Sequence, residues 1–217
     1  MKWINLVAFF VLFYTEISQG AYLNKSRVVI SDNETKYVTV INNEGFDYNV
    51  LVNIDYGLGE HHEVYAYPSV FKIRANEKKS IQLTNFSKLK DEFEKIIHLN
   101  VTFLKGDVKG IEEHEKTQIR LKGHKAITHR IKILIRPNGI KSTHFSNKMY
   151  PDFELIESAG VNKIINNERK YITLIAKGNK IIDIEPMSSY EITPPFSKYY
   201  FVDDIGATMK AFPGLQP

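Results

Sequence analysis

Residues 126–139 read AITHRIKILIRPNG, and they carry the clearest structural pattern in the chain. Isoleucines at Ile127, Ile131 and Ile135 recur at odd-numbered positions, while polar side chains fill most of the positions between them. Successive side chains of a β-strand point to opposite faces, so this spacing predicts a strand with one apolar face. The proline and glycine that follow predict its end.

Shorter runs of the same kind flank this strand. KYVTVI at 36–41 and YNVLVNIDY at 48–56 alternate in the same way and end at asparagine- and glycine-rich turns. A succession of such strands is typical of an all-β, immunoglobulin-like β-sandwich. We predict one complete sandwich at 21–139 and a second, abbreviated sandwich at 140–217, because the second segment is short for a full domain.

The first twenty residues predict a signal peptide. Lys2 precedes an apolar run at 4–14, and small residues stand before a cleavage point at Ala21. The apolar run is too short to span a bilayer, and a buried N-terminal helix is the alternative. We therefore expect 1–20 to be removed, and we expect a secreted or periplasmic product without membrane insertion of the mature chain.

Composition excludes several classes of protein. The chain has 217 residues, a formal charge of +4 and no cysteine. Without cysteine there is no disulfide scaffold, cysteine nucleophile, thiolate zinc site or iron–sulfur cluster. The positive charge is mild, so it does not demand nucleic acid, although it favours a carboxylate-bearing partner.

The sequence contains none of the common catalytic motifs. It has no glycine-rich phosphate loop, no nucleophile elbow and no zinc-protease helix. Adjacent histidines such as His61 and His62 point apart on an extended backbone, and nothing fixes the spacing of Glu112, Glu113 and Glu115. We predict that the chain is not an enzyme and has no cofactor or metal. A hydrolase that depends on His61 or His62 is a weaker alternative.

Four segments, in this order after a signal peptide, resemble one family. They are NKSRVVI at 24–30, YPSVFKI at 67–73, IKILIRP at 131–137 and FVDDIGA at 201–207. Together they resemble the PapD-like periplasmic pilus-assembly (fimbrial) chaperones. The long polar segment 106–125 resembles the long-loop subclass, although this chain lacks the disulfide that often braces that loop.

The resemblance implies both a fold and a function. It implies two immunoglobulin-like β-sandwich domains set at an angle. It also implies a periplasmic chaperone that binds pilin subunits by donor-strand complementation, prevents their aggregation and delivers them to an outer-membrane usher, without ATP. An exposed strand edge on such a client is prone to aggregate, and a lent strand protects it. A secreted immunoglobulin-like adhesion or structural protein is the alternative.

The resemblance also assigns residues to the client site. Arg27 and Lys132 match the two cations that hold the client's C-terminal carboxylate; otherwise they are solvated surface cations. For the donor strand the candidates are Ile127 and Ile131, with Leu121 and Ile119 further out. Each buried isoleucine would contribute roughly 1.5–3 kcal/mol. The alternative is that these isoleucines fill the chain's own core.

Two further assignments concern the domain junction and a turn. Glu94, Arg136 and Asp204 match a charged trio that sits between the domains in the family. Pro68 matches a position where the family has a cis peptide bond. The donor segment departs from the family at Gly123, where a large apolar side chain is usual, so either a bulge shifts its register or the apolar stretch is interrupted.

Overall fold

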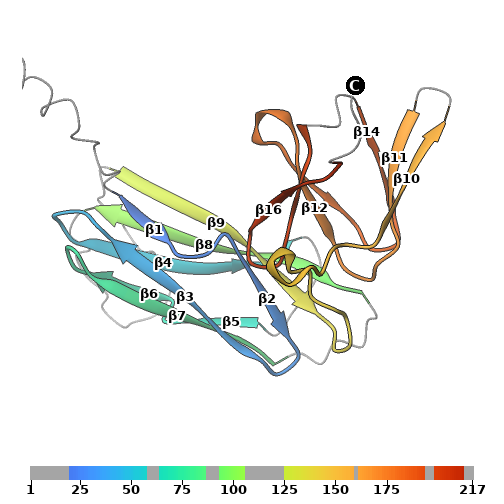
Figure 1. Ribbon diagram of the computed structural model, residues 1–217. Coiled ribbons are helices and arrows are strands. Elements are labelled where there is room, and N and C mark those ends of the chain that lie inside the picture. Colours follow the sequence, from blue (N-terminus) through green and yellow to red (C-terminus); the bar gives the residue numbers. More distant parts are fainter. Residues whose placement is uncertain are drawn as a thin grey trace, which may run out of the picture.

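The computed structural model describes residues 20–57, 64–86, 93–105, 125–158, 161–193 and 198–212. These residues form β-strands, with two single-turn 3-10 helices at Phe145–Asn147 and Lys177–Asn179. The strands build two sandwiches set at an angle, as the sequence predicted (Figure 1). In the described residues no helix has the length and apolar character needed to cross a bilayer.

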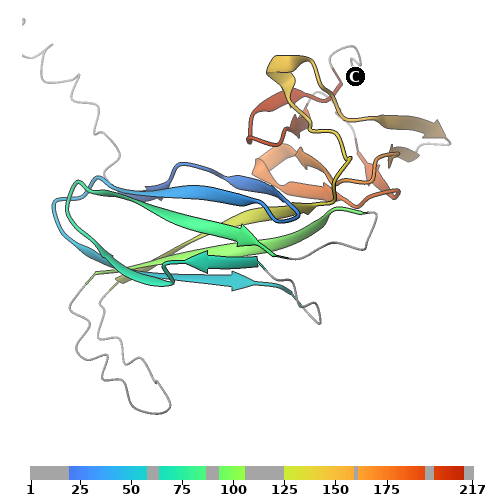
Figure 2. The ribbon, with the colours of Figure 1, turned by 90° about the horizontal axis from the view of Figure 1, so that it is seen from below.

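The first sandwich pairs a four-stranded sheet with a five-stranded sheet. Figure 2 shows this sandwich from below, with its strands running along its length. The first sheet contains, in spatial order, β1 (Ala21–Leu23), β3 (Thr35–Asn42), β7 (Lys78–Asn85) and β5 (Val64–Tyr67). The second contains β2 (Arg27–Ser31), β9 (Lys125–Arg136), β8 (Lys95–Lys105), β4 (Tyr48–Asp55) and β6 (Val70–Ile73).

The second sandwich has smaller sheets and mostly shorter strands. One sheet contains β10 (Phe153–Ser158), β11 (Val161–Asn166) and β14 (Ser189–Ile192). The other contains β13 (Ile181–Ile184), β12 (Ile172–Ile175), β15 (Tyr200–Val202) and β16 (Thr208–Lys210). Its own hydrophobic core, which includes Leu174 and Phe201, is separate from that of the first sandwich.

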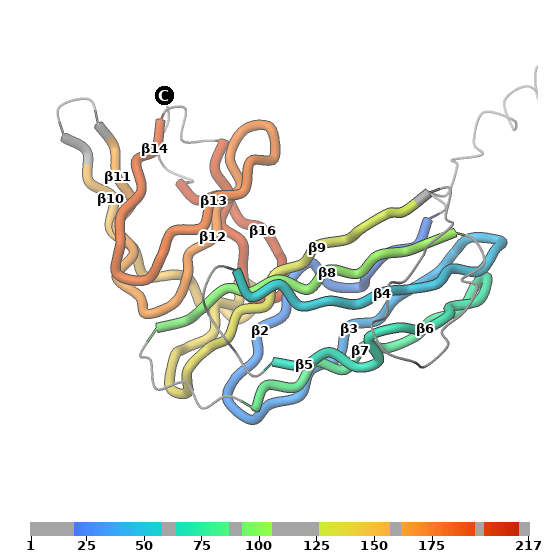
Figure 3. The backbone as a smooth tube through the Cα atoms, turned by 180° about the vertical axis from the view of Figure 1, so that it is seen from behind, coloured from blue at the N-terminus to red at the C-terminus, as the bar shows by residue number. Residues whose placement is uncertain are grey.

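The N-terminal segment contributes to both sheets of the first sandwich. β1 pairs antiparallel with β3, and then β2 pairs parallel with β9 in the other sheet. β9 runs along the sandwich to the junction with the second one (Figure 3). The same strand therefore belongs to the core of the first sandwich and to the contact between the two.

The core position of Ile131 bears on its predicted role in the donor strand. Ile131 is only 7% exposed and belongs to the hydrophobic core of the first sandwich, together with Ile133 and Ile135. Its burial favours the alternative that this isoleucine fills the chain's own core, and its role as a donor stays a prediction. Ile127, on the same face but nearer the start of β9, is 36% exposed because its own sandwich covers it less.

The Tyr67–Pro68 peptide bond is cis. It lies between β5, in one sheet, and β6, in the other. The proline therefore sits where the chain crosses from one layer of the first sandwich to the next.

The two isoleucines should differ in their effect on stability. Ile131→Ala should lower the free energy of unfolding by about 2–5 kcal/mol, because it leaves a cavity in a packed core. Ile127→Ala, the matched control on the same strand face, should cost less than about 1 kcal/mol. Urea denaturation followed by circular dichroism measures both. Equal losses in the two variants would contradict this placement.

Candidate functional site

The two predicted anchor cations lie side by side. Arg27 is the first residue of β2, and the parallel register of β2 and β9 pairs it with Lys132. Paired residues on neighbouring strands point to the same face of a sheet. The backbone therefore brings both cations to one face, close to the second sandwich.

Arg27 is a buried cation without a close anion among the described residues. It is 8% exposed, and its guanidinium makes no hydrogen bond or ion pair with any other residue that the structure describes. Burial lowers the pKa of Arg27 below its ordinary value, although the charges of Asp183 and Asp204 act in the opposite direction. A charge removed from water is costly unless it is paired, so this position is suited to receive an anion.

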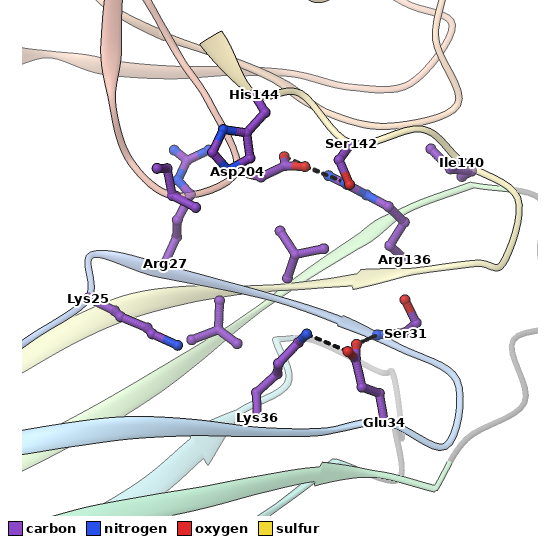
Figure 4. Close-up of a pocket in the computed structure, with 13 residues that line it drawn as sticks. Lys25, Arg27, Ser31, Glu34, Lys36, Arg136, Ile140, Ser142, His144 and Asp204 are labelled. Atoms are coloured by element: carbon purple, nitrogen blue, oxygen red, sulfur yellow. Dashed lines mark hydrogen bonds and ion pairs between the residues drawn. The ribbon is translucent and has the colours of Figure 1, made fainter. Parts of the chain in front are cut away.

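Arg27 lines a cleft of about 410 Å³ at the junction of the sandwiches. Figure 4 shows its side chain rising from β2 toward the segment that carries His144. The two carboxylates of this cleft already have partners, since Glu34 pairs with Lys36 and Asp204 pairs with Arg136. The cleft therefore has an excess of positive charge.

That excess comes from two side chains. Lys25 and Arg27 are the cleft-lining cations without an ion pair among the described residues. Both belong to the segment that links β1 to β2 or opens β2. An anion that enters the cleft therefore meets uncompensated charge on the N-terminal side.

Lys132, by contrast, already has a partner. Its Nζ donates hydrogen bonds to Asp183 Oδ1 at 2.6 Å and to Asp183 Oδ2 at 2.5 Å. Asp183 lies on β13 of the second sandwich. The sequence reasoning missed this residue; the available signal was an acidic residue in the otherwise apolar strand IIDI at 181–184.

One edge of β9 is only partly paired. β8 pairs with β9 from Lys125 to Ile135, whereas β2, on the other side, pairs with it only from Lys132 to Arg136. Within the described residues, the edge of β9 before Lys132 is thus open to another strand. At about 3.3 Å per residue it is roughly 20 Å long. Arg27, at the start of β2, stands where this open edge ends.

The structure describes two of the predicted donor residues beside this open edge. Ile127 lies on it and is partly exposed. Leu121 and Ile119 lie outside the described residues, as does Gly123. The structure therefore places one of the predicted donors, Ile127, on an available edge and removes another, Ile131, to the core.

Arg136 joins Glu94 to Asp204 in one buried network. Its Nε donates to Glu94 Oε2 at 2.5 Å, and its Nη1 and Nη2 donate to the two oxygens of Asp204 at 2.5 and 2.9 Å. The arginine side chain is 4% exposed and that of Glu94 is fully buried. Since Asp204 follows β15 of the second sandwich, the network spans the junction.

Backbone groups complete the network. Glu94 Oε1 accepts a hydrogen bond from the Tyr171 N–H at 3.1 Å, and Asp204 Oδ2 accepts one from the Thr143 N–H at 2.9 Å. Burial alone would lower the pKa of Arg136, but the hydrogen bonds and charges of Asp204 and Glu94 outweigh it and hold that pKa above its ordinary range. The guanidinium is therefore fully charged.

The turn that carries Asp204 fits closely against the first sandwich. Gly206 has φ +88°, and a Cβ built there would lie 2.4 Å from the Ser26 Oγ. The backbone conformation therefore favours glycine, and any larger residue would also displace the Ser26 hydroxyl. Asp203, 1% exposed, holds the turn by accepting hydrogen bonds from the N–H groups of Ile205 and Ala207 at 3.1 and 2.8 Å.

The family model for the pili and flagellar-assembly chaperones, PapD N-terminal domain, matches residues 20–141, which is more than half of the chain. The chain belongs to this family. No curated protein sequence matches it. The match covers the whole first sandwich, including the anchor cations and the open edge of β9.

Solved chaperone structures share the fold. The periplasmic chaperone SfaE aligns with TM-score 0.65 and 19% identity, over 88% of this chain and 96% of that one. The E. coli chaperone DraB aligns with TM-score 0.61 and 20% identity, over 88% and 95%. A chain of the Salmonella enterica SafA pilin–SafB chaperone complex aligns with TM-score 0.63 and 14% identity, over 88% and 93%. Alignment of nearly full length extends the likeness to both sandwiches.

Within the described ranges no three histidine, aspartate or glutamate side chains gather in a way that could hold a metal ion. His61, His62 and the acidic run from Glu112 to Glu115 lie outside those ranges. The anchor region is thus the functional site that the described residues support.

The pKa of His98 depends on the charges of Lys132 and its partner Asp183. His98 is the register partner of Lys132 on β8. Burial lowers the pKa of His98, and the charges of Arg130 and Lys132 lower it further, while those of Asp55 and Asp183 oppose them. The pKa therefore lies below its ordinary value, and it depends on which charges remain nearby.

The pKa of His98 should consequently move in opposite directions in two variants. Lys132→Met should raise it by removing a neighbouring positive charge, and Asp183→Asn should lower it by removing a negative one. NMR titration of the imidazole protons measures both shifts. A His98 pKa that stays constant in both variants would contradict the proximity of this histidine to the anchor.

Loss of the buried arginine should be far more costly than loss of an exposed one. Arg136→Ala should lower the free energy of unfolding by about 3–5 kcal/mol, because it leaves buried Glu94 uncompensated. Arg130→Ala is the control: its 2.9 Å ion pair with Asp55 is solvent-exposed, so its removal should cost about 0–1 kcal/mol. Chemical denaturation compares the two. A loss below about 1 kcal/mol for Arg136→Ala would contradict the structural role of the network.

Proposed function

We propose that this chain is a periplasmic chaperone that binds pilin subunits by donor-strand complementation, prevents their aggregation and delivers them to an outer-membrane usher. One observation carries the proposal: in the part of the chain that the structure describes, an open edge of β9 ends beside Arg27, a buried cation without a close anion. Main-chain groups on such an edge pair with an incoming strand, and the cation suits the carboxylate at that strand's end.

The direction of the client strand follows from the pairing. β2 occupies the far part of this side of β9 and runs parallel to it from Lys132 onward. A client strand that fills the open part and places its C-terminal carboxylate at Arg27 must approach β2 end to end. It therefore also runs parallel to β9.

The anchor then acts through two cations on neighbouring strands. Arg27 faces the cleft without a partner, and Lys132 lies beside it in register. Charge-assisted hydrogen bonds contribute roughly 1.5–3 kcal/mol each, so two of them fix the end of a client strand firmly. Fixing that end also fixes the register of the strand beside β9.

Apolar side chains of β9 supply the other part of the interaction. The β9 side chains that share a face with Ile127 are buried in the chain's own core from Ile131 onward. Nearer the start of β9, Ile127 itself is 36% exposed. We propose that Ile127 enters the hydrophobic groove of the client, with Leu121 and Ile119 extending the contact. A fully buried isoleucine contributes roughly 1.5–3 kcal/mol.

The setting of the protein is part of the same proposal. The SafA–SafB structure is a complex of a pilin with a chaperone, and its similar fold supports a pilin client for the present chain. The predicted signal peptide at 1–20 supports a periplasmic location, where delivery to an usher takes place. The role requires neither catalysis nor a cofactor, since strand pairing and burial supply the binding energy.

We also propose a division into domains at 21–139 and 140–217. The separation of the two hydrophobic cores supports it. The network of Glu94, Arg136 and Asp204 would then set the angle between the domains, because it is buried and charged on both sides of the boundary.

The anchor can be tested by recovery of a complex. Arg27→Ala and Lys132→Ala should each abolish co-purification with a pilin subunit expressed in the same periplasm, because the client's terminal carboxylate loses a cation. Affinity purification of the tagged chaperone, followed by gel electrophoresis, measures the yield of complex. Circular dichroism establishes that each variant is folded.

Arg130→Ala serves as the matched control for this experiment. It removes a cation from the same strand, but this one already pairs with Asp55 and lies 54% exposed. It should leave the yield of complex unchanged. Normal yields from Arg27→Ala and Lys132→Ala would refute the assignment of the anchor.

A further inference from the structure

The Lys132 ammonium is bound by a carboxylate of the chain's own second sandwich. Both oxygens of Asp183 accept hydrogen bonds from Lys132 Nζ, at 2.6 and 2.5 Å, across 51 residues of sequence. The two side chains are 15% and 26% exposed, so water screens this pair only in part. A carboxylate therefore already stands at one of the two proposed anchor cations.

The second sandwich holds Asp183 in this position. On β13 the side chains alternate, with Ile182 and Ile184 buried and Asp183 on the opposite face. The register partner of Asp183 on β12 is Thr173, whose hydroxyl donates a hydrogen bond to Asp183 Oδ1 at 2.8 Å. Since Thr173 is itself 2% exposed, this bond ties the carboxylate to the packed interior.

Asp183 also acts on the second anchor cation. Among the charges that influence Arg27, that of Asp183 has the largest effect. One carboxylate thus serves two adjacent cations: it binds Lys132 directly and acts on Arg27 from a greater distance. Asp204, Glu94 and Asp203 also act on Arg27, but Asp183 is the carboxylate that binds the neighbouring lysine as well.

We propose that Asp183 is an internal competitor for the client's C-terminal carboxylate, which it opposes at Lys132 while Arg27 stays open to receive it. This inference rests on the anchor role proposed above. A client carboxylate first meets the free Arg27. It then shares or takes over a lysine whose hydrogen bonds are already directed at another carboxylate, and it is repelled by that carboxylate.

The competitor makes the anchor reversible. When a client leaves, Lys132 does not remain as a partly buried, unpaired charge, because Asp183 is beside it. Client binding and client release then both exchange one carboxylate for another at Lys132. Neither step leaves this lysine as an unpaired charge in the cleft. Without Asp183, the site would hold two uncompensated cations and would bind a carboxylate more tightly.

The test replaces Asp183 by uncharged residues and measures the binding of two matched peptides to each variant. Asp183→Asn removes the charge but keeps the size of the side chain and an oxygen for Thr173; Asp183→Ser is a second variant in case the first is unstable. Asp55→Asn is the control, because Asp55 pairs with Arg130 on the same sheet and not with Lys132. The probe is a fluorescein-labelled hexapeptide of alternating threonine and valine, ending in a free carboxylate or in an amide. Fluorescence anisotropy gives the affinities.

We expect Asp183→Asn to bind the free-acid peptide about ten-fold more tightly than the unchanged protein does, because a charge-assisted contact no longer has an internal rival. The amide peptide should bind equally to both proteins. Asp55→Asn should behave like the unchanged protein with either peptide. A gain confined to the free acid is the signature of competition at a carboxylate site.

Two results would overturn the inference, and they differ. If the unchanged protein prefers the acid to the amide but Asp183→Asn binds the acid equally or less tightly, Asp183 only orients Lys132, and the anchor stands without a competitor. If the unchanged protein does not distinguish acid from amide, the anchor itself fails, and the competitor role fails with it.

Discussion

The arrangement of the whole molecule depends on how one buried positive charge is neutralised. Arg136 stands at the end of β9, shielded from water, and its guanidinium is satisfied from two directions, by Glu94 of the first sandwich and by Asp204 of the second. Neither carboxylate alone would complete the geometry of the guanidinium fork. The two sandwiches therefore have to meet at this point, and Gly206 of the second lies close to Ser26 of the first beside it. The junction cleft exists because this contact is fixed.

Strand β9 then has three roles along its length, and the pairing explains why they do not conflict. Its last residues carry Arg136 to the junction, its middle fills the core of the first sandwich, and its first residues keep one edge open. The boundary between the second and third roles is the start of β2. An aggregation-prone open edge is normally blunted in a free protein. Here Arg130, whose side chain is 54% exposed, supplies a charged side chain along this edge.

Much of this could be read from the sequence, and the exceptions have physical reasons. The alternation in 126–139 predicted β9, and the resemblance predicted that Glu94, Arg136 and Asp204 sit between the domains, where the structure brings them together. Strands such as β1 and β16 were not predicted, because three residues carry no measurable alternation. The burial of Ile131 was not predicted, because alternation identifies a face of a strand but not how far its own sandwich covers that face. Asp183 was missed because its partner, Lys132, is distant in sequence and on the other sandwich.

The position of β2 has a consequence for the range of clients. β2 occupies one edge of β9 from Lys132 onward, so a client strand on the open part of that edge has to end where β2 begins. Its position along β9 would then be set by its last residue and not by its side chains. Two subunits with different sequences but the same distance between chain end and groove would lie in the same register. Arg27 is itself the first residue of β2, so the proposed anchor and the point where β2 blocks the edge stay together. In the proposed role, the start of β2 would therefore set the register of a client strand from its C-terminal end, whatever its other side chains.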